Sequence, residues 1–259
     1  MKIHRSTYYY QINCTFNKYS KIEQVIKDIY FSREDRPGYR RITLALKNIG
    51  IVINHKTVLK LMRNLGIKGK VKDRKYNSYK DDAGEILPNV INRDFKADRP
   101  MQKLSTDVTQ FNVLGEKIYL SPTIDLFNNE VIAYDIRKSP NLNQTKAMLN
   151  KLFKRLPEGA NPILHSDQGW QYRHKEYKQL LKEHNIIQSM SRKGNCYDNS
   201  PIESFFGRLK IEMFYDEKFE SVEEFIDKLH EYIYYYNNER ICTRLKTSPV
   251  QYRINFENQ

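Results

Sequence analysis

Cysteine is scarce in this chain of 259 residues, and its three copies, Cys14, Cys196 and Cys242, lie far apart. They form no CxxC pair, and the histidines show no ligand spacing with them. The sequence therefore supports neither a zinc ribbon nor a disulfide framework. We expect a reducing, cytoplasmic setting in which the thiols are structural or incidental.

Long hydrophobic runs are also missing. No stretch approaches the roughly eighteen consecutive apolar residues of a transmembrane helix. The first residues, MKIHRSTYYYQIN, lack the apolar segment of a secretory signal, so we do not expect secretion. What is present is the composition of a globular protein, long enough to bury a core and to divide into two or three units.

Acidic residues are scarce only in the first part of the chain. Residues 1–100 hold 22 Lys and Arg against 10 Asp and Glu, whereas residues 101–259 hold 22 against 21. A basic part joined to a near-neutral remainder indicates a nucleic-acid-binding arm on a different kind of domain. A basic surface that serves only solubility is the alternative.

Three segments of the basic part have the apolar spacing of helices: residues 20–32, 40–50 and 54–66. Ser20 and Asn54 are suited to be N-caps. The last two helices, joined by a tight turn, describe a helix-turn-helix, and we assign residues 1–66 to an arm plus this DNA-binding domain. Its outward side chains would contact DNA: His55, Lys56, Thr57, Lys60 and Arg63. A three-helix bundle with a solvated basic face is the alternative.

The remainder predicts an α/β domain. Residues 67–99 are polar and charged, which indicates a basic linker lying on phosphate. Within residues 100–215, strand-like and helix-like segments follow in the order βββαβαβα, a mixed sheet and not a Rossmann pattern. Pro122 lies inside the second strand and conflicts with a central position there, a conflict that a bulge would resolve. Residues 216–259 would form a C-terminal helix and a tail packed on this core.

Three acids mark the candidate site. Asp107 lies in the first strand-like run, Asp167 ends a short apolar run, and Glu203 opens a helix after 35 intervening residues. Phosphodiester cleavage and joining are served by two Mg²⁺ ions about 3.5–4 Å apart, which take hard oxygen ligands. Carboxylates on three elements that converge at one end of a sheet could hold such ions.

Each acid also has an ordinary structural interpretation. Asp107 could be the polar half of an alternating strand, although Asp disfavours strands. Asp167 could cap the turn at Gly169. Glu203 could complete a capping box with Ser200. Two further strand acids are interpreted as structural: Asp125 and Asp135.

Several stretches resemble the OrfB-type transposases of the IS-three family of bacterial insertion sequences, within the DDE integrase/transposase superfamily. They are STDVTQF, YLSPTIDLFNNEVIAYDI, HSDQGWQY, SMSRKGNCYDNSPIESFFGRLK and YNNERICTRLKTSPVQY. GYRRITLALKNIGIVINHKTVLKLMRNLGI resembles the helix-turn-helix before that family's core, and the likeness covers about residues 30–252. Cys242 stands where the family usually has His. A His/His/Cys/Cys zinc module is missing, which argues against a retroviral integrase.

The resemblance implies an RNase H-like catalytic core that nicks 3′ ends and transfers strands with two Mg²⁺ or Mn²⁺ ions. Asp107, Asp167 and Glu203 would be the ligands. Lys210, seven residues after Glu203, would position DNA. The loop before the helix offers further phosphate contacts, or is a plain surface loop: Arg192, Lys193 and Asn195. Trp170 and Tyr172 could stack on a frayed base or pack in the core.

The expected partners follow from this resemblance. They are transposon-end and target DNA, further copies of the chain in a homo-oligomer on DNA, and an upstream OrfA product or fusion. The setting would be the bacterial cytoplasm at the nucleoid. Two rivals stay open: a non-catalytic DNA-binding regulator derived from a transposase, and a nuclease of the same fold that only hydrolyses. The intact acid triad favours catalysis over the regulator.

Overall fold

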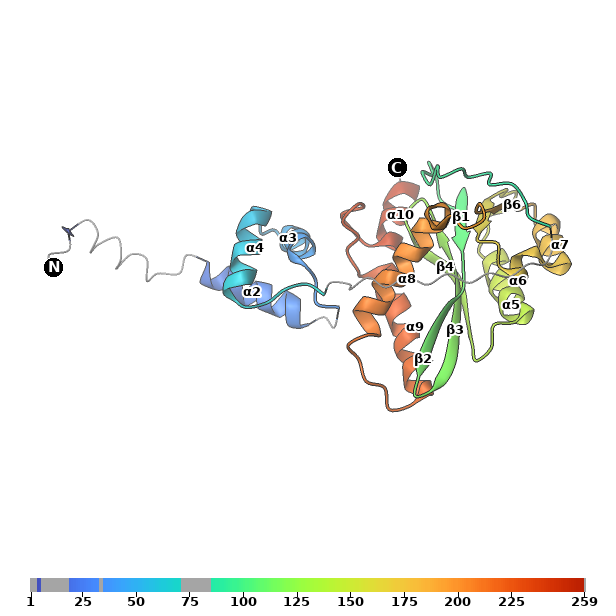
Figure 1. Ribbon diagram of the computed structural model, residues 1–259. Helices are drawn as coiled ribbons and strands as arrows, with labels where there is room; N and C mark the ends of the chain where they lie inside the picture. The colour runs from blue at the N-terminus through green and yellow to red at the C-terminus, as the bar shows by residue number, and fades with distance from the viewer. Residues whose placement is uncertain (1–3, 6–18, 33–34, 71–84, 259) are drawn as a thin grey trace. The chain divides into compact units, whose positions relative to one another are not determined.

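The computed structural model describes residues 4–5, 19–32, 35–70 and 85–258 (Figure 1). The chain divides into two compact units, residues 1–70 and 71–259. The expected N-terminal arm lies almost entirely outside the described residues. In the described part of the chain, no helix is both long and apolar enough to cross a membrane.

The first unit is built from three helices around a small core. They are α2 (Ser20–Phe31), α3 (Tyr39–Asn48) and α4 (His55–Asn64). Apolar residues at helical spacing form the buried core, together with Tyr30: Ile26, Ile42, Leu46, Val58, Leu61 and Met62. The amphipathic spacing therefore identified the three helices and most of their buried positions.

The ends of these helices agree with the sequence in part. Asn54 caps α4, since its side chain accepts a hydrogen bond from the Lys56 N–H at 2.8 Å. Ser20 is not an N-cap, because α2 begins at that residue and Tyr19 precedes it without a capping bond. Ile49 lies within the helix expected over residues 40–50, but it is 61% exposed, because α3 ends at Asn48.

The second unit contains a mixed sheet whose first strand is interrupted. Strands β1 (Lys103–Thr106) and β2 (Thr109–Val113) pair antiparallel with β3 (Glu116–Asp125) in one continuous register. Strand β4 (Val131–Arg137) pairs with the other edge of β3. Strand β5 (Ile163–Ser166) runs parallel to β1. The last strand, β6 (Ile187–Met190), runs parallel to β5.

The sheet resolves the conflict at Pro122. Its β3–β4 ladder shifts register between Thr123 and Ile124, one residue past the proline, so the predicted irregularity is present. The carbonyl of Pro122 accepts a hydrogen bond from the Thr106 hydroxyl at 2.9 Å. Strand β3 therefore stays continuous and carries neighbours on both edges.

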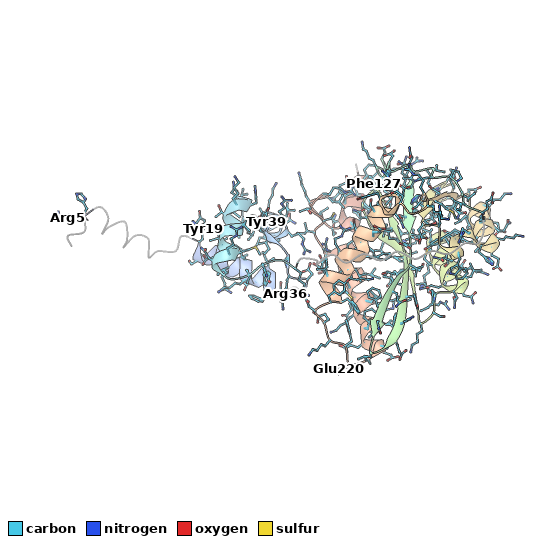
Figure 2. All side chains as sticks on the ribbon, in the orientation of Figure 1. Arg5, Tyr19, Arg36, Tyr39, Phe127 and Glu220 are labelled. Carbon is cyan, nitrogen blue, oxygen red and sulfur yellow. The ribbon has the colours of Figure 1, made fainter. Side chains whose placement is uncertain are left out.

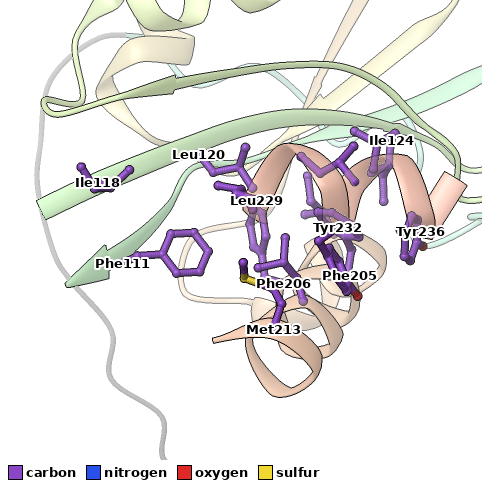
Figure 3. Packing of buried hydrophobic residues seen from close by; sticks show 14 of the residues in the cluster. Phe111, Ile118, Leu120, Ile124, Phe205, Phe206, Met213, Leu229, Tyr232 and Tyr236 are labelled. Atoms are coloured by element: carbon purple, nitrogen blue, oxygen red, sulfur yellow. The ribbon is translucent and has the colours of Figure 1, made fainter. Parts of the chain in front are cut away.

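Helices cover both faces of the sheet (Figure 1). On one side lie α5 (Leu142–Phe153), α6 (Trp170–Arg173) and α7 (Lys175–Glu183). On the other lie α8 (Ser200–Met213) and α9 (Val222–Asn238). Figure 3 shows the second core, where side chains of β2 and β3 meet those of α8 and α9. This packing fixes the helix that carries Glu203 against the strand that leads from Asp107.

Three elements were not predicted from the sequence. They are the short helix α6, the 3₁₀ turn η1 (Cys196–Asn199) and the final helix α10 (Pro249–Glu257). Ser248 caps α10 by accepting a hydrogen bond from the Gln251 N–H at 3.4 Å. The Ser-Pro pair at 248–249 was an available start signal for this helix.

The linker prediction needs a correction over residues 85–99, because this segment packs on the second unit. The Val90 N–H donates to the Ser189 hydroxyl at 2.9 Å. Ile91 is only 3% exposed and belongs to the core beneath α8 and α9. Residues 71–84 of the predicted linker lie outside the described residues.

Candidate active site

Asp107 occupies the interruption between β1 and β2. Its side chain is half-buried. Its Oδ1 accepts a hydrogen bond from the Val108 N–H at 2.7 Å, and its Oδ2 accepts one from the Asn199 amide at 3.4 Å. The strand is therefore interrupted at Asp107, whose carboxylate is a proposed metal ligand for phosphodiester chemistry. This break explains how an Asp is tolerated in a strand-like run.

Asp167 follows directly after β5. Ser105 of β1 is paired with His165 of β5, and each aspartate lies two residues beyond its paired residue. Because β1 and β5 are parallel, both carboxylates fall at the same edge of the sheet. The Asp167 Oδ1 also accepts the Gly169 N–H at 2.9 Å, so the predicted turn cap is confirmed. The two roles are compatible, since a carboxylate has further lone pairs.

The turn after Asp167 is closely packed. A Cβ atom added at Gly169 would lie 2.9 Å from the Asp167 Oδ1. It would also lie 2.6 Å from the Gln171 amide nitrogen, so a larger residue at this position would displace the side chains of both Asp167 and Gln171. The Gly169 N–H bond restrains one oxygen of Asp167 within this turn.

Glu203 lies in the first turn of α8 and is exposed. The alternative that Ser200 and Glu203 form a capping box is not supported, because α8 already begins at Ser200. Asn199 occupies the N-cap position and makes no side-chain cap bond. A capping role therefore does not account for the glutamate at position 203, which leaves a functional role for Glu203 as the better explanation.

The electrostatics link these acids. Burial raises the pKa of Asp107 well above its usual range, and the negative charges of Asp167 and Glu203 raise it further. Burial also raises the pKa of Asp167, although the hydrogen bond from the Gly169 N–H and the positive charge of Arg173 each lower it in part. Like charges therefore repel within this site, an arrangement that a bound cation would relieve.

The convergence of the three carboxylates is incomplete. Within residues 4–5, 19–32, 35–70 and 85–258, no group of three or more His, Cys, Asp or Glu side chains is arranged to hold a metal ion. The two aspartates share one edge of the sheet, and Glu203 lies within range of the charge on Asp107. A joint role for all three as metal ligands stays a prediction.

Lys210 lies two helical turns beyond Glu203 on α8. Its ammonium nitrogen is 5.2 Å from the centroid of the Phe111 ring. Its positive charge lowers the pKa of Asp107. Glu203 and Lys210 therefore both act on the same aspartate, as expected for one face of a helix.

The loop before α8 is tied down by Asp198, a buried residue that the sequence did not single out. Arg192, proposed as a phosphate contact, directs its Nε to the Asp198 Oδ2 at 2.9 Å. Arg93 adds a second ion pair at 2.7 Å. Burial opposes ionisation, but hydrogen bonds from Arg192 and Arg93 hold the pKa of Asp198 well below its usual range. Lys193 is exposed and Asn195 is half-buried.

The two aromatic residues considered for base stacking, Trp170 and Tyr172, differ in exposure. Trp170 is 43% exposed beside the turn after Asp167. Tyr172 is completely buried and packs edge-on against Tyr177, with ring centroids 5.4 Å apart. Core packing is therefore the correct interpretation for Tyr172.

The predicted DNA-contact residues of the first unit are exposed on α4: His55, Lys56, Lys60 and Arg63. Thr57 is half-buried. The His55 ring stacks on Tyr39, which Figure 2 labels, at 6.1 Å between centroids. These exposures agree with the basic helix face expected for α4.

A mixed sheet with an acid after each of two adjacent parallel strands, and a third acid on the helix packed beside them, defines an integrase-type catalytic core with the RNase H-like fold. The comparisons with known proteins agree. The family described as Integrase core domain matches residues 97–196, and a second model of that description matches residues 203–256. The family described as HTH-like domain matches residues 18–75.

Relatives extend the match over the chain. An Escherichia coli K12 protein assigned as transposase InsK of insertion sequence element IS150 is 50% identical over 97% of this chain and 90% of its own length. A transposase-like protein of Haemophilus influenzae is 54% identical over 78% of this chain and 94% of its own. Transposase InsF of insertion sequence IS3A from Escherichia coli K12 is 35% identical, over 78% and 70%.

One solved structure supports the fold. The intasome of simian T-cell lymphotropic virus in complex with the PP2A regulatory subunit B56 gamma gives a TM-score of 0.52 at 15% identity, over 81% of this chain and 69% of that one. The chain belongs to the IS-three (IS3) family of DDE transposases. It is a DNA transposase, which confirms the predicted resemblance and favours the enzyme over the regulator and the nuclease.

Proposed function

We propose that this transposase nicks the 3′ ends of its element and joins them to target DNA by direct transesterification, with Asp107, Asp167 and Glu203 as the ligands of two Mg²⁺ or Mn²⁺ ions. One observation carries the proposal. Two half-buried carboxylates lie at the same edge of the sheet, and the charges of Asp167 and Glu203 both raise the pKa of Asp107.

The donor set fits such ions. Carboxylate oxygens are the hard ligands that Mg²⁺ and Mn²⁺ prefer, and substrate phosphate and water complete their shells. When bound, the ions make the attacking oxygen nucleophilic and neutralise charge on the leaving oxygen. Asp107 and Asp167 each have one oxygen held by a backbone N–H, which fixes their direction. Glu203 would approach from α8 and complete the set.

Lys210 is proposed to bind a phosphate of the DNA strand beside the acids. Its place on the Glu203 face of α8 and its effect on Asp107 support this role. Lys193, Asn195 and Arg192 would add contacts along the loop before α8. The ion pair between Arg192 and Asp198 is a competing structural role for that arginine.

We propose that different regions of the chain bind DNA, connect the domains, carry out catalysis and support the core. Residues 1–66 would bind DNA through α4, and residues 67–84 would connect this domain to the core, since residues 85–99 pack on the second unit. Residues 100–215 would carry catalysis, and residues 216–259 would support them. The exposed basic side chains of α4 and the buried packing of α9 support these roles.

The working assembly is proposed to be a homo-oligomer on transposon-end and target DNA, joined by an upstream OrfA product or fusion, in the bacterial cytoplasm at the nucleoid. Transposition requires two element ends to be held together. Further copies of the chain are the simplest way to supply two sites. The family membership supports each of these partners.

The test is a strand-transfer assay on oligonucleotides carrying the element's ends, with Mg²⁺. Asp107→Asn and Glu203→Gln should each lower nicking and joining by at least about 100-fold, because each removes charge from the proposed ligand set. Glu223→Gln is the matched control, an exposed acid in the first turn of α9. An Asp107→Asn variant that nicks and joins like the parent would refute the proposal. Hydrolysis without joining would indicate a nuclease.

A further inference from the structure

Asn199 makes an unusual use of its amide. It is 3% exposed and immediately precedes α8, the helix of Glu203. Its Oδ1 accepts a hydrogen bond from the Ser105 hydroxyl at 3.0 Å. Its Nδ2 donates to the Asp107 Oδ2 at 3.4 Å. One side chain thus ties the start of α8 to β1 and to the first acid of the site.

The amide is not used where an Asn in this position normally acts. Asn is a favoured N-cap because its side chain can accept a hydrogen bond from the first turn of the helix. Asn199 makes no such bond to α8. The side chain instead reaches across to β1, so its contacts serve the neighbouring strand and not its own helix.

The backbone beside Asn199 is fixed by the next residue toward the N-terminus. The buried Asp198 carboxylate accepts hydrogen bonds from Asn89 at 3.0 Å and from Arg93 at 2.7 Å. It also accepts the Arg192 backbone N–H at 3.0 Å. Donors from two separate segments therefore hold η1, and with it the position from which Asn199 reaches Asp107.

We propose that Asn199 is a positioning residue that orients the Asp107 carboxylate for metal binding. The inference rests on the proposed metal role of Asp107. An ionised carboxylate only accepts hydrogen bonds, so the NH₂ group must face it, and the Ser105 hydroxyl holds the amide in that orientation. The Val108 N–H restrains one oxygen of Asp107 and Asn199 restrains the other.

A neutral donor suits this place. A lysine or arginine would bring a competing positive charge, and an aspartate would add to the repulsion between carboxylates. An amide leaves the remaining lone pairs of Asp107 and the full charge of the site to the cation. Partners that orient a metal ligand in this way commonly change metal affinity by about 10- to 100-fold when removed.

The test uses metal binding and not activity alone. The chain has a single tryptophan, Trp170, three residues after Asp167 and partly exposed, so Mn²⁺ bound at the acid pair is expected to quench its fluorescence. Asn199→Ala should raise the Mn²⁺ concentration of half-maximal quenching by about tenfold. Asn199→Ser should do the same, because serine is a good N-cap but too short to span to Asp107.

The control is Asn237→Ala. Asn237 is also buried, and its amide joins α9 to both the N–H and the carbonyl of Val131 at 2.9 Å. Its loss should lower the melting temperature without changing the Mn²⁺ midpoint. The inference is overturned if both Asn199 variants bind Mn²⁺ like the parent and the control.

Asp107→Asn separates the two proposals. If it binds Mn²⁺ like the parent, or if quenching of the parent never saturates, the metal proposal fails and this inference with it. If Asp107→Asn loses binding while the Asn199 variants keep it, only the positioning role fails.

Discussion

The ammonium group of Lys210 takes part in two interactions whose contributions can be told apart by measuring stability and strand transfer separately. It lies over the Phe111 ring at 5.2 Å and acts electrostatically on Asp107. A cation over an aromatic ring at a partly exposed site contributes about 0.5–1 kcal/mol to stability. Its charge beside the acid pair would contribute to DNA positioning instead. The contact with the Phe111 ring therefore affects the stability of the fold, whereas the charge beside the acids would affect strand transfer.

Lys210→Ala is predicted to lower the strand-transfer rate at least about tenfold while lowering the free energy of unfolding by less than about 1 kcal/mol. Lys228→Ala is the matched control, since Lys228 of α9 lies over the Phe219 ring at 5.7 Å. Transfer rates and urea denaturation of both variants make the comparison. Equal transfer rates for the two variants would contradict a DNA role for Lys210.

At the scale of elements, α8 is fastened to the chain after α9 by a buried ion pair. Arg240 donates two hydrogen bonds to the Glu212 carboxylate, at 2.6 and 2.7 Å, and Tyr232 donates a third at 2.9 Å. Both members of the pair are at least nine-tenths buried. Removing one partner leaves the other charge buried and uncompensated.

Glu212→Gln is therefore predicted to lower the free energy of unfolding by about 3–5 kcal/mol. Replacing both Glu212 and Arg240 by Met should recover much of that loss, because no buried charge then remains. Glu257→Gln provides the contrast, since it breaks an exposed pair with Arg253 that is worth less than about 1 kcal/mol. Urea denaturation checks all three, and a loss below about 1 kcal/mol for Glu212→Gln would contradict the argument.

Asp125, at the end of β3, links stability to pH. Its two oxygens accept the Met101 and Phe127 N–H groups at 2.8 and 3.0 Å, yet burial raises its pKa to about 6 from 3.8. A raised folded-state pKa means that its contribution to stability is complete below about pH 3.8. That contribution is lost as the pH rises through about 6.

The stability of the parent relative to Asp125→Asn is thus predicted to fall by about 3 kcal/mol between pH 4 and pH 7, at about 1.4 kcal/mol for each unit of pKa difference. Taking the difference between two chains cancels groups common to both. Urea denaturation at several pH values measures it. A difference that stays constant or grows with pH would show that Asp125 is not the group responsible.

These elements also show what the sequence could and could not predict. Strong apolar periodicity located α2, α3, α4, α8 and α9, because a buried helix face repeats regularly. Helix α10 buries only Pro249 and has no such repeat. The break at Asp107 and the packing of residues 85–99 depend on distant partners that no local pattern contains. The long-range bonds of Asn199 and Asp198 were missed for the same reason.

Over the whole molecule, the positive charge is concentrated in the first 100 residues, with 22 Lys and Arg against 10 Asp and Glu. Exposed basic side chains on α4 belong to this excess. Each phosphate that such a side chain neutralises releases condensed cations and steepens the dependence of DNA affinity on salt. The number of phosphate contacts can therefore be estimated from the salt dependence of DNA affinity in solution.

Replacing Lys60 and Arg63 together by Gln is predicted to reduce the slope of log affinity against log salt by up to about 2, since each lost phosphate contact contributes about 0.9 on duplex DNA. Lys21 and Lys27 of α2 are also exposed, so their double replacement by Gln removes the same charge from a different helix. Fluorescence anisotropy of the full chain on a labelled duplex at several salt concentrations gives both slopes. If α4 contacts DNA, only the first variant should lose slope. Equal losses would mean that overall charge, and not the face of α4, governs binding.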